Sequence, residues 1–234
     1  MKPVALIAFN FVREQRWPIL VLLIWVLLLA FLGLAEPNSH DDLLLIFKIV
    51  GAYVVVFSIF FGGSAIYNER RSRRILAVLA KAVSRQQYLS GLVLGVTLAS
   101  VIYCFALGLT GSWTLSGVGF RISQVWFLML CLVSACTLAG TVALTFSTFL
   151  NPFFAAGATA LVLILPPLMG RIVSTRWVNV IPVYTLASAV LGSSFEVPAS
   201  QLWLPLGLAV LETVFFWLIA ARIFAWVDIA VSVE

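Results

Sequence analysis

The sequence predicts an all-α membrane protein with six transmembrane helices, and three observations support this prediction. First, 63% of the 234 residues are hydrophobic, only 10% are charged, and the mean hydropathy is +1.13, a composition that excludes an ordinary soluble domain. Second, the apolar residues gather into six runs, each about as long as the roughly 20 residues that a helix needs to cross a bilayer. Third, one long polar stretch, residues 68–87, interrupts them. The rest of the chain is too short for a further folded domain, so we expect a single transmembrane domain over residues 1–234.

Residues 1–17 predict an amphipathic interfacial helix that lies along the cytoplasmic leaflet of the membrane. At about 100° per residue, its polar and apolar residues fall on opposite faces. The two sets are Lys2, Asn10, Arg13 and Glu14 against Val4, Ala8, Phe11 and Val12. The apolar run at residues 19–35 is longer than the core of a usual secretory signal, so we expect it to remain as the first span.

The six spans are expected at residues 18–35, 43–67, 88–110, 124–150, 153–169 and 201–227. Asn151-Pro152 predicts a tight turn between the fourth and fifth spans, because proline cannot continue a helix and restricts the residue before it. Pro166-Pro167 predicts the end of the fifth span. Residues 170–200 are too apolar for a plain outer loop, so we expect a re-entrant-like segment of short helices before the sixth span.

The polar stretch at residues 68–87 sets the expected orientation. It holds six basic residues against one acid: Arg70, Arg71, Arg73, Arg74, Lys81 and Arg85 against Glu69. The positive-inside rule places such a segment in the cytoplasm. With six spans both termini lie on that same side, together with ten of the fourteen basic residues. We therefore expect a multi-pass protein of the inner (cytoplasmic) membrane with both termini cytoplasmic. The net charge of +5 then reflects topology, and no nucleic-acid partner is expected.

Read as one helix, this stretch is amphipathic. Four of its basic residues, Arg70, Arg74, Lys81 and Arg85, fall within an arc of about 60°. The apolar residues Ile75, Leu76, Leu79 and Val83 lie on the opposite face. Such a basic stripe predicts a docking element for something outside the bilayer. The alternative is that these cations only fix the topology and contact anionic membrane lipid.

In layout, essentially the whole chain resembles an ABC-2 type permease, the membrane subunit of a type V ABC exporter. The most specific resemblance lies in the polar stretch, where the residues that match the family pattern are Glu69, Leu76, Leu79 and the turn Val83-Ser84-Arg85. The chain departs from that pattern with Arg73-Arg74 where Gly-Thr is usual, Ala82 where proline is usual, and Leu92 where lysine is usual.

The resemblance implies that residues 68–87 form a coupling helix that seats in a groove of a separate ATPase. The implied coupling residues are Glu69, Arg70, Arg73, Arg74, Lys81, Val83, Ser84 and Arg85. It also implies two permease copies, identical or closely related, with two ATPase subunits that bind ATP and Mg. The chain itself contains no Gly-x-x-x-x-Gly-Lys-Ser/Thr sequence to cradle phosphates, so we expect it to be neither an enzyme nor a holder of cofactors. For Glu69, a local ion pair with Arg73 is an equal alternative.

A cluster of aromatic residues marks the inner half of the second span. By analogy with the family, the second and fifth spans line a central pathway at the dimer interface. The wall residues implied by this analogy are Phe57, Phe60, Phe61 and Thr159. Ordinary helix packing is the alternative interpretation, with Gly62 and Gly63 allowing close approach of a neighbouring helix.

Glu212 is the one acid deep within a predicted span. A buried carboxylate is costly and should face the bundle or a wet cavity. It could contact substrate or carry protons, or it could equally accept hydrogen bonds from hydroxyls such as those of Thr97 and Thr145.

No metal site or disulfide framework is expected. The single histidine, His40, stands beside Asp41 and Asp42 in an outer loop, without a second histidine or a cysteine nearby. The three cysteines, Cys104, Cys131 and Cys136, lie inside apolar runs and are interpreted as small hydrophobic residues.

The sequence therefore favours an exporter permease that moves an amphipathic or hydrophobic substrate outward, a substrate class suggested by the aromatic and charge-poor second span. An ATP-independent channel or scaffold subunit is the alternative. An intramembrane enzyme is disfavoured, because it would need a buried nucleophile with a base or paired acids around a metal, and Glu212 is the only such group within the spans.

Overall fold

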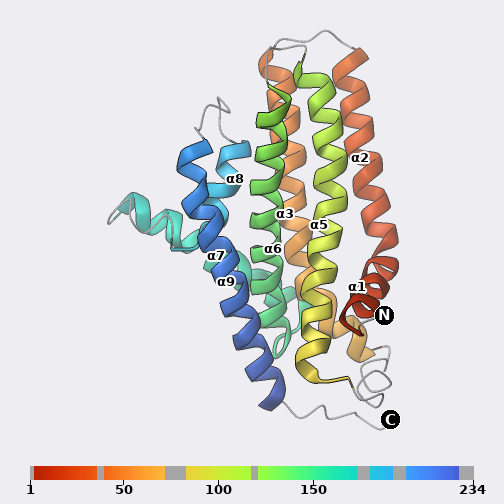
Figure 1. The fold of residues 1–234 in the computed structure, drawn as a ribbon, viewed down its shortest axis with the longest axis vertical. Coiled ribbons are helices and arrows are strands. Elements are labelled where there is room, and N and C mark those ends of the chain that lie inside the picture. The colour runs from red at the N-terminus through yellow and green to blue at the C-terminus, as the bar shows by residue number, and fades with distance from the viewer. Residues whose placement is uncertain are drawn as a thin grey trace.

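The computed structural model describes residues 3–35, 40–71, 83–116, 121–172, 180–191 and 199–226. Over these residues the chain is helical, with eight α-helices and no strand (Figure 1). With the labels of Figure 1, the helices are α1 (Pro3–Glu14), α2 (Arg16–Ala35), α3 (His40–Arg71), α5 (Arg85–Ser116), α6 (Ile122–Ser147), α7 (Pro152–Ile172), α8 (Val183–Leu191) and α9 (Ala199–Trp226). The predicted all-α class is thus confirmed for the described part of the chain.

Five of these helices contain stretches that are long and apolar enough to cross a membrane. The stretches are Phe47–Tyr67, Arg85–Trp113, Ile122–Ser147, Pro152–Met169 and Ser200–Trp226. They indicate a multi-pass membrane protein, and they coincide with the second to sixth predicted spans. The first predicted span, residues 18–35, falls in α2, which contains the shorter apolar stretch Arg16–Leu28.

Helix α6 forms the centre of the bundle and packs against α3, α5, α7, α8 and α9. Its buried face is rich in small residues, which let neighbouring backbones come close. A Cβ added at Gly62 of α3 would collide with the carbonyl oxygen of Gly140 in α6, and one added at Gly140 would lie 2.5 Å from Val96 of α5. Ser58 donates a hydrogen bond to the carbonyl oxygen of Cys136 at the same crossing. Helices α3 and α6 therefore cross at nearly backbone-to-backbone contact, and the Val96 side chain of α5 packs against the same point.

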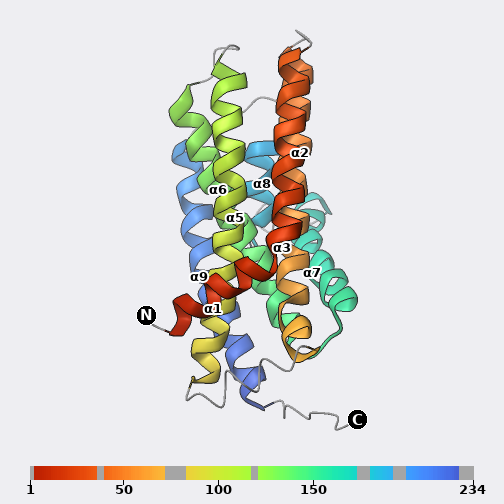
Figure 2. The ribbon, with the colours of Figure 1, turned by 90° about the vertical axis from the view of Figure 1, so that its right-hand side faces the viewer.

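Helix α1 lies across the lower part of α5, at a large angle to α2 (Figure 2). Its residues Ala8 and Phe11 are buried, and its residues Ile7 and Phe11 pack against two glycines of α5. A Cβ at Gly91 would lie 2.6 Å from Ile7, and one at Gly95 would lie 2.7 Å from Phe11. The apolar face predicted for residues 1–17 is therefore covered by the chain itself, and the exposed side of α1 faces outward.

The chain beyond α6 turns sharply and differs from the expectation at one point. Pro152 begins α7, where its missing N–H costs nothing. The predicted stop at Pro166-Pro167 is wrong, because α7 continues through both prolines to Ile172. A proline removes one backbone hydrogen bond and can bend a helix without ending it, especially in apolar surroundings where neighbouring helices support the bend.

Part of the predicted outer segment at residues 170–200 is also described. It contains the short helix α8, which packs against α3 and α6 and buries Val183, Leu186 and Ala189. Figures 1 and 2 show α8 standing higher in the bundle than α7. Residues 173–179 and 192–198 lie outside the described part of the chain.

Candidate functional site

Those predicted coupling residues that the structure describes lie at the end of the bundle where α3 ends and α5 and α9 have their lower ends (Figure 1). Glu69 and Arg70 belong to the last turn of α3, which ends at Arg71. Arg73, Arg74 and Lys81 lie outside the described residues. The exit from this segment, residues 83–85, is described in full and leads directly into α5.

Ser84 caps the N-terminus of α5 with a reciprocal pair of hydrogen bonds. The backbone N–H of Gln87 donates to the Ser84 hydroxyl at 3.2 Å, and the backbone N–H of Ser84 donates to the Gln87 side-chain oxygen at 3.3 Å. This is the capping-box arrangement, in which two otherwise unpaired N–H groups of a helix start are satisfied. Val83, just before the cap, packs against the hydrophobic core. The start of α5 is therefore fixed locally by its own sequence.

Arg85 then ties this start to the far end of the chain. Its Nη1 donates to the carbonyl oxygens of Phe224 at 2.8 Å and Ala225 at 3.0 Å. Its guanidinium also lies 5.9 Å from the centre of the Phe224 ring, on which Tyr88 of α5 stacks at 6.2 Å. The last carbonyls of a helix have no partner within it and carry partial negative charge, so a cation is well matched to them. We call Arg85, Tyr88 and Phe224 the α5–α9 clamp.

The clamp changes the interpretation of one predicted docking cation. The sequence placed Arg85 on an outward basic stripe with Arg70, Arg74 and Lys81, but its guanidinium is hydrogen-bonded within the chain. Tyr88 and Phe224 did not stand out in the sequence. The signal that was present, Ser-x-x-Gln before an apolar helix, predicts the cap but says nothing about a partner 139 residues away.

Glu212 lies on α9, and its Oε2 is buried without a hydrogen-bond partner in the described part of the chain. The hydroxyl of Thr97 donates to the Val93 carbonyl at 2.9 Å. The hydroxyl of Thr145 is shared between the carbonyls of Thr141 at 2.9 Å and Phe216 at 3.2 Å. Neither threonine therefore supplies the hydrogen bond that one interpretation of Glu212 required. A buried polar atom without a partner calls for an explanation, and a ligand is one.

The other predicted pathway residues are divided between the core and the surface. Phe61 is buried and lies 6.1 Å, ring centre to ring centre, from Phe57, whereas Phe60 is exposed. Thr159 is buried, and its hydroxyl donates to the Ala155 carbonyl within α7 at 2.7 Å. Helices α3 and α7 do pack together, so the structure brings the two predicted spans side by side while giving these residues different surroundings.

An apolar groove that sequence reasoning missed lies between α3, α7 and α8. Its volume is about 420 Å³. The residues that line it include Val56, Ile59, Leu163, Ile164, Pro167 and Tyr184. The groove depends on the tilt of α7 against α3, which no local pattern encodes. It can accommodate a hydrocarbon chain, because it offers apolar contacts along its whole length.

Compared with protein-family models and with curated proteins, the chain matches none. Within the described ranges, no group of three or more histidine, cysteine, aspartate or glutamate side chains could hold a metal ion.

Proposed function

We propose that this chain is the transmembrane permease subunit of an ABC exporter. It couples ATP hydrolysis by a separate nucleotide-binding subunit to the outward movement of an amphipathic or hydrophobic substrate. The observation that carries the proposal is the arrangement around residues 68–87. This basic segment leaves α3 and enters α5 at one end of the bundle, and its exit is capped by Ser84 and bonded through Arg85 to α9.

The α5–α9 clamp supports a mechanical role for this segment. A force applied to residues 68–87 reaches α5 through its capped first turn, which the hydrogen bonds between Ser84 and Gln87 hold in place. The hydrogen bonds from Arg85 to the end of α9 then move α9 with α5. In this proposal ATP-driven closure of two nucleotide-binding subunits displaces the segment, and these subunits bind the ATP and Mg.

The proposed assembly contains two such ATPase subunits and a second permease copy, identical or closely related. It lies in the cytoplasmic membrane with α2 as the first of six spans, both termini and residues 68–87 in the cytoplasm, and residues 170–200 as a re-entrant-like outer segment. The apolar groove between α3, α7 and α8 and the exposed ring of Phe60 support a hydrophobic or amphipathic substrate. The Oε2 of Glu212, which has no hydrogen-bond partner among the described residues, supports a polar contact with that substrate.

The test is purification of the tagged chain from its native membrane in mild detergent, with mass spectrometry of the proteins that accompany it. We expect a stoichiometric ATPase with a P-loop, and we expect it to be lost from the Arg70→Glu/Arg74→Glu variant. The matched control is Lys48→Glu/Arg121→Glu, which reverses two charges at the opposite end of the bundle. Arg85 is unsuitable for this test, because its reversal would also break the clamp.

Two results would contradict the proposal. If the chain purifies without any ATPase, also after crosslinking in the membrane, the channel or scaffold alternative replaces it. If the ATPase stays bound to the Arg70→Glu/Arg74→Glu variant as firmly as to the control, residues 68–87 are not the docking element.

A further inference from the structure

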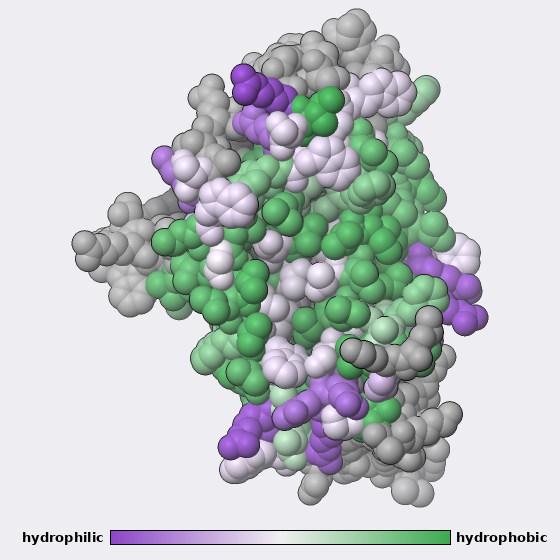
Figure 3. Space-filling view, in the orientation of Figure 1, coloured by the Kyte–Doolittle hydropathy of each residue, from purple (hydrophilic) through white to green (hydrophobic). Residues whose placement is uncertain are grey.

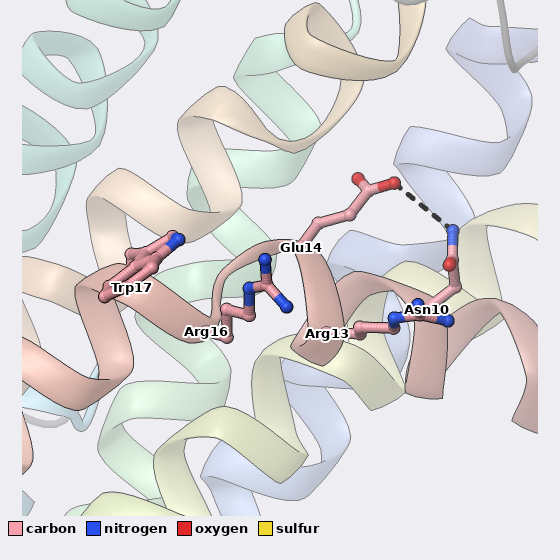
Figure 4. Close-up of a pocket in the computed structure, with 5 residues that line it drawn as sticks. All are labelled: Asn10, Arg13, Glu14, Arg16 and Trp17. Atoms are coloured by element: carbon pink, nitrogen blue, oxygen red, sulfur yellow. Dashed lines mark hydrogen bonds between the residues drawn. The ribbon is translucent and has the colours of Figure 1, made fainter.

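A polar hollow lies at the elbow between α1 and α2, on the outside of the bundle. Its volume is about 500 Å³, and five residues line it: Asn10, Arg13, Glu14, Arg16 and Trp17 (Figure 4). We call it the elbow pocket. Neither the proposed coupling segment nor the apolar groove includes any of these residues, so the pocket needs an explanation of its own.

The elbow is a fixed bend rather than a loose joint. Pro18 has no N–H to donate to the carbonyl of Glu14, so the helix bends there. The backbone nevertheless stays bonded through Gln15, whose N–H donates to Phe11 at 3.0 Å and whose carbonyl accepts from Ile19 at 3.0 Å. On the N-terminal side of the bend, α1 is held in place by its packing on α5 at Gly91 and Gly95. Residues on both sides of the bend are therefore preorganised around the pocket.

The pocket carries an excess of positive charge. Its lining contains two guanidinium groups, from Arg13 and Arg16, and one carboxylate, from Glu14. That carboxylate accepts a hydrogen bond from the side-chain nitrogen of Asn10 at 3.3 Å, and Figure 4 shows it turned toward Asn10 and away from the Arg16 guanidinium. Within the described ranges neither arginine has a salt bridge. Two arginines without carboxylate partners are suited to a phosphate group, whose oxygens match the planar guanidinium.

Large apolar side chains are also exposed on α1 and at the start of α2, the two helices that carry the arginines. Leu6, Phe9 and Trp17 are 53%, 71% and 67% exposed, and the Arg16 guanidinium lies 5.8 Å from the centre of the Trp17 ring. Figure 3 shows a hydrophilic patch against the hydrophobic surface at the right-hand edge, at the height of this elbow. Exposed aromatic residues beside arginines are typical of the headgroup layer of a membrane. The anion that this pocket meets is then the phosphate of a phospholipid rather than a free ion.

We propose that the elbow pocket binds the phosphate of an anionic phospholipid, with Arg13 and Arg16 on the phosphate oxygens and Trp17 and Phe9 beside the glycerol and acyl chains. The proposal does not depend on the exporter function. It assigns to α1 a lipid site of defined chemistry, whereas the positive charge of residues 68–87 predicts only general attraction to a membrane surface.

The test is native mass spectrometry of the purified full chain titrated with phosphatidylglycerol. Diacylglycerol with the same acyl chains serves as the lipid without phosphate, and inorganic phosphate serves as the anion without lipid. We expect Arg13→Gln/Arg16→Gln to weaken phosphatidylglycerol binding roughly 30-fold, the effect of removing two basic contacts at a membrane surface. The control pair Arg121→Gln/Arg222→Gln removes the same charge elsewhere and should bind as the wild type does. Arg13→Lys/Arg16→Lys keeps the charge and should recover part of the affinity.

Three results would overturn the proposal. Equal binding of diacylglycerol and phosphatidylglycerol would show apolar adhesion without phosphate recognition. Displacement of the lipid by inorganic phosphate would show a site for a free anion. Unchanged phosphatidylglycerol binding by Arg13→Gln/Arg16→Gln, with an unfolding temperature equal to that of the wild type, would place the lipid elsewhere.

Discussion

Nη1 of Arg85 lies 2.8 Å from the carbonyl oxygen of Phe224, a residue 139 positions later in the chain. This single hydrogen bond joins the first residue of α5 to the last turn of α9. It belongs to the clamp in which the Tyr88 ring stacks on the Phe224 ring. The start of α5 and the end of α9, which lie side by side, are thereby held together.

Removal of the clamp should destabilise the protein. Arg85→Gln loses two hydrogen bonds from a charged donor and leaves two helix-terminal carbonyls without their partner, so we expect the free energy of unfolding to fall by about 2 kcal/mol. Thermal unfolding in detergent measures this as a lower transition temperature. Arg222→Gln, which removes an exposed cation one turn away on α9, is the control. Equal transition temperatures for the two variants would show that the clamp contributes nothing to stability.

The contact between α3 and α6 should not tolerate even one methyl group. In Gly62→Ala the new Cβ would collide with the Gly140 carbonyl, and backbone cannot move aside cheaply, so we expect a loss of at least about 2 kcal/mol. The controls are Gly157→Ala and Gly207→Ala, since nothing lies within 4 Å of an added Cβ at either position. These should be neutral or stabilising by up to about 1 kcal/mol, because alanine favours a helix over glycine. If all three variants unfold alike, the close approach of α3 and α6 is wrong.

The hydrogen bond that caps the start of α5 should contribute to the stability of the protein. Ser84→Ala removes the acceptor for the Gln87 N–H and should cost about 1 kcal/mol, whereas Ser84→Asp keeps an acceptor and should cost less. Amide hydrogen exchange over residues 83–88 provides the local measurement, with faster exchange expected in Ser84→Ala alone. Equal protection in the alanine and aspartate variants would mean that the hydroxyl does not cap the helix.

Substitution of Glu212 should separate function from stability. The buried Oε2 has no partner among the residues that the structure describes, so Glu212→Gln should leave the unfolding temperature unchanged or raise it, because a buried carboxylate is costly. Under the proposed function, ATP-driven transport of a hydrophobic dye into proteoliposomes should fall about tenfold or more, a loss of about 1.4 kcal/mol in transition-state stabilisation. A variant that is less stable but transports normally would assign Glu212 a structural role instead.

The sequence was sufficient for features that depend on short stretches. Hydropathy over about 20 residues located the second to sixth predicted spans, and the spacing of Ser84 and Gln87 contains the whole capping box. Features that depend on how distant segments meet could not be predicted. Gly62 matters because it lies against Gly140 of another helix. The partner of Arg85 is a backbone carbonyl of α9, and its position is known only once the fold is known. The prolines of α7 were misjudged for the same reason, since neighbouring helices decide whether a proline bends or ends a helix.

Because Arg85 bonds to main-chain oxygens, the last turn of α9 is recognised by where its backbone ends as well as by the ring of Phe224. Substitutions at Ala225 would leave both acceptors in place. An insertion or deletion of one residue earlier in α9 would rotate the terminal carbonyls by about 100° and point them away from the guanidinium. The clamp therefore depends on the length of α9: position 225 can change its side chain, whereas the ring of Phe224 and the number of residues between the bundle and the clamp must stay fixed.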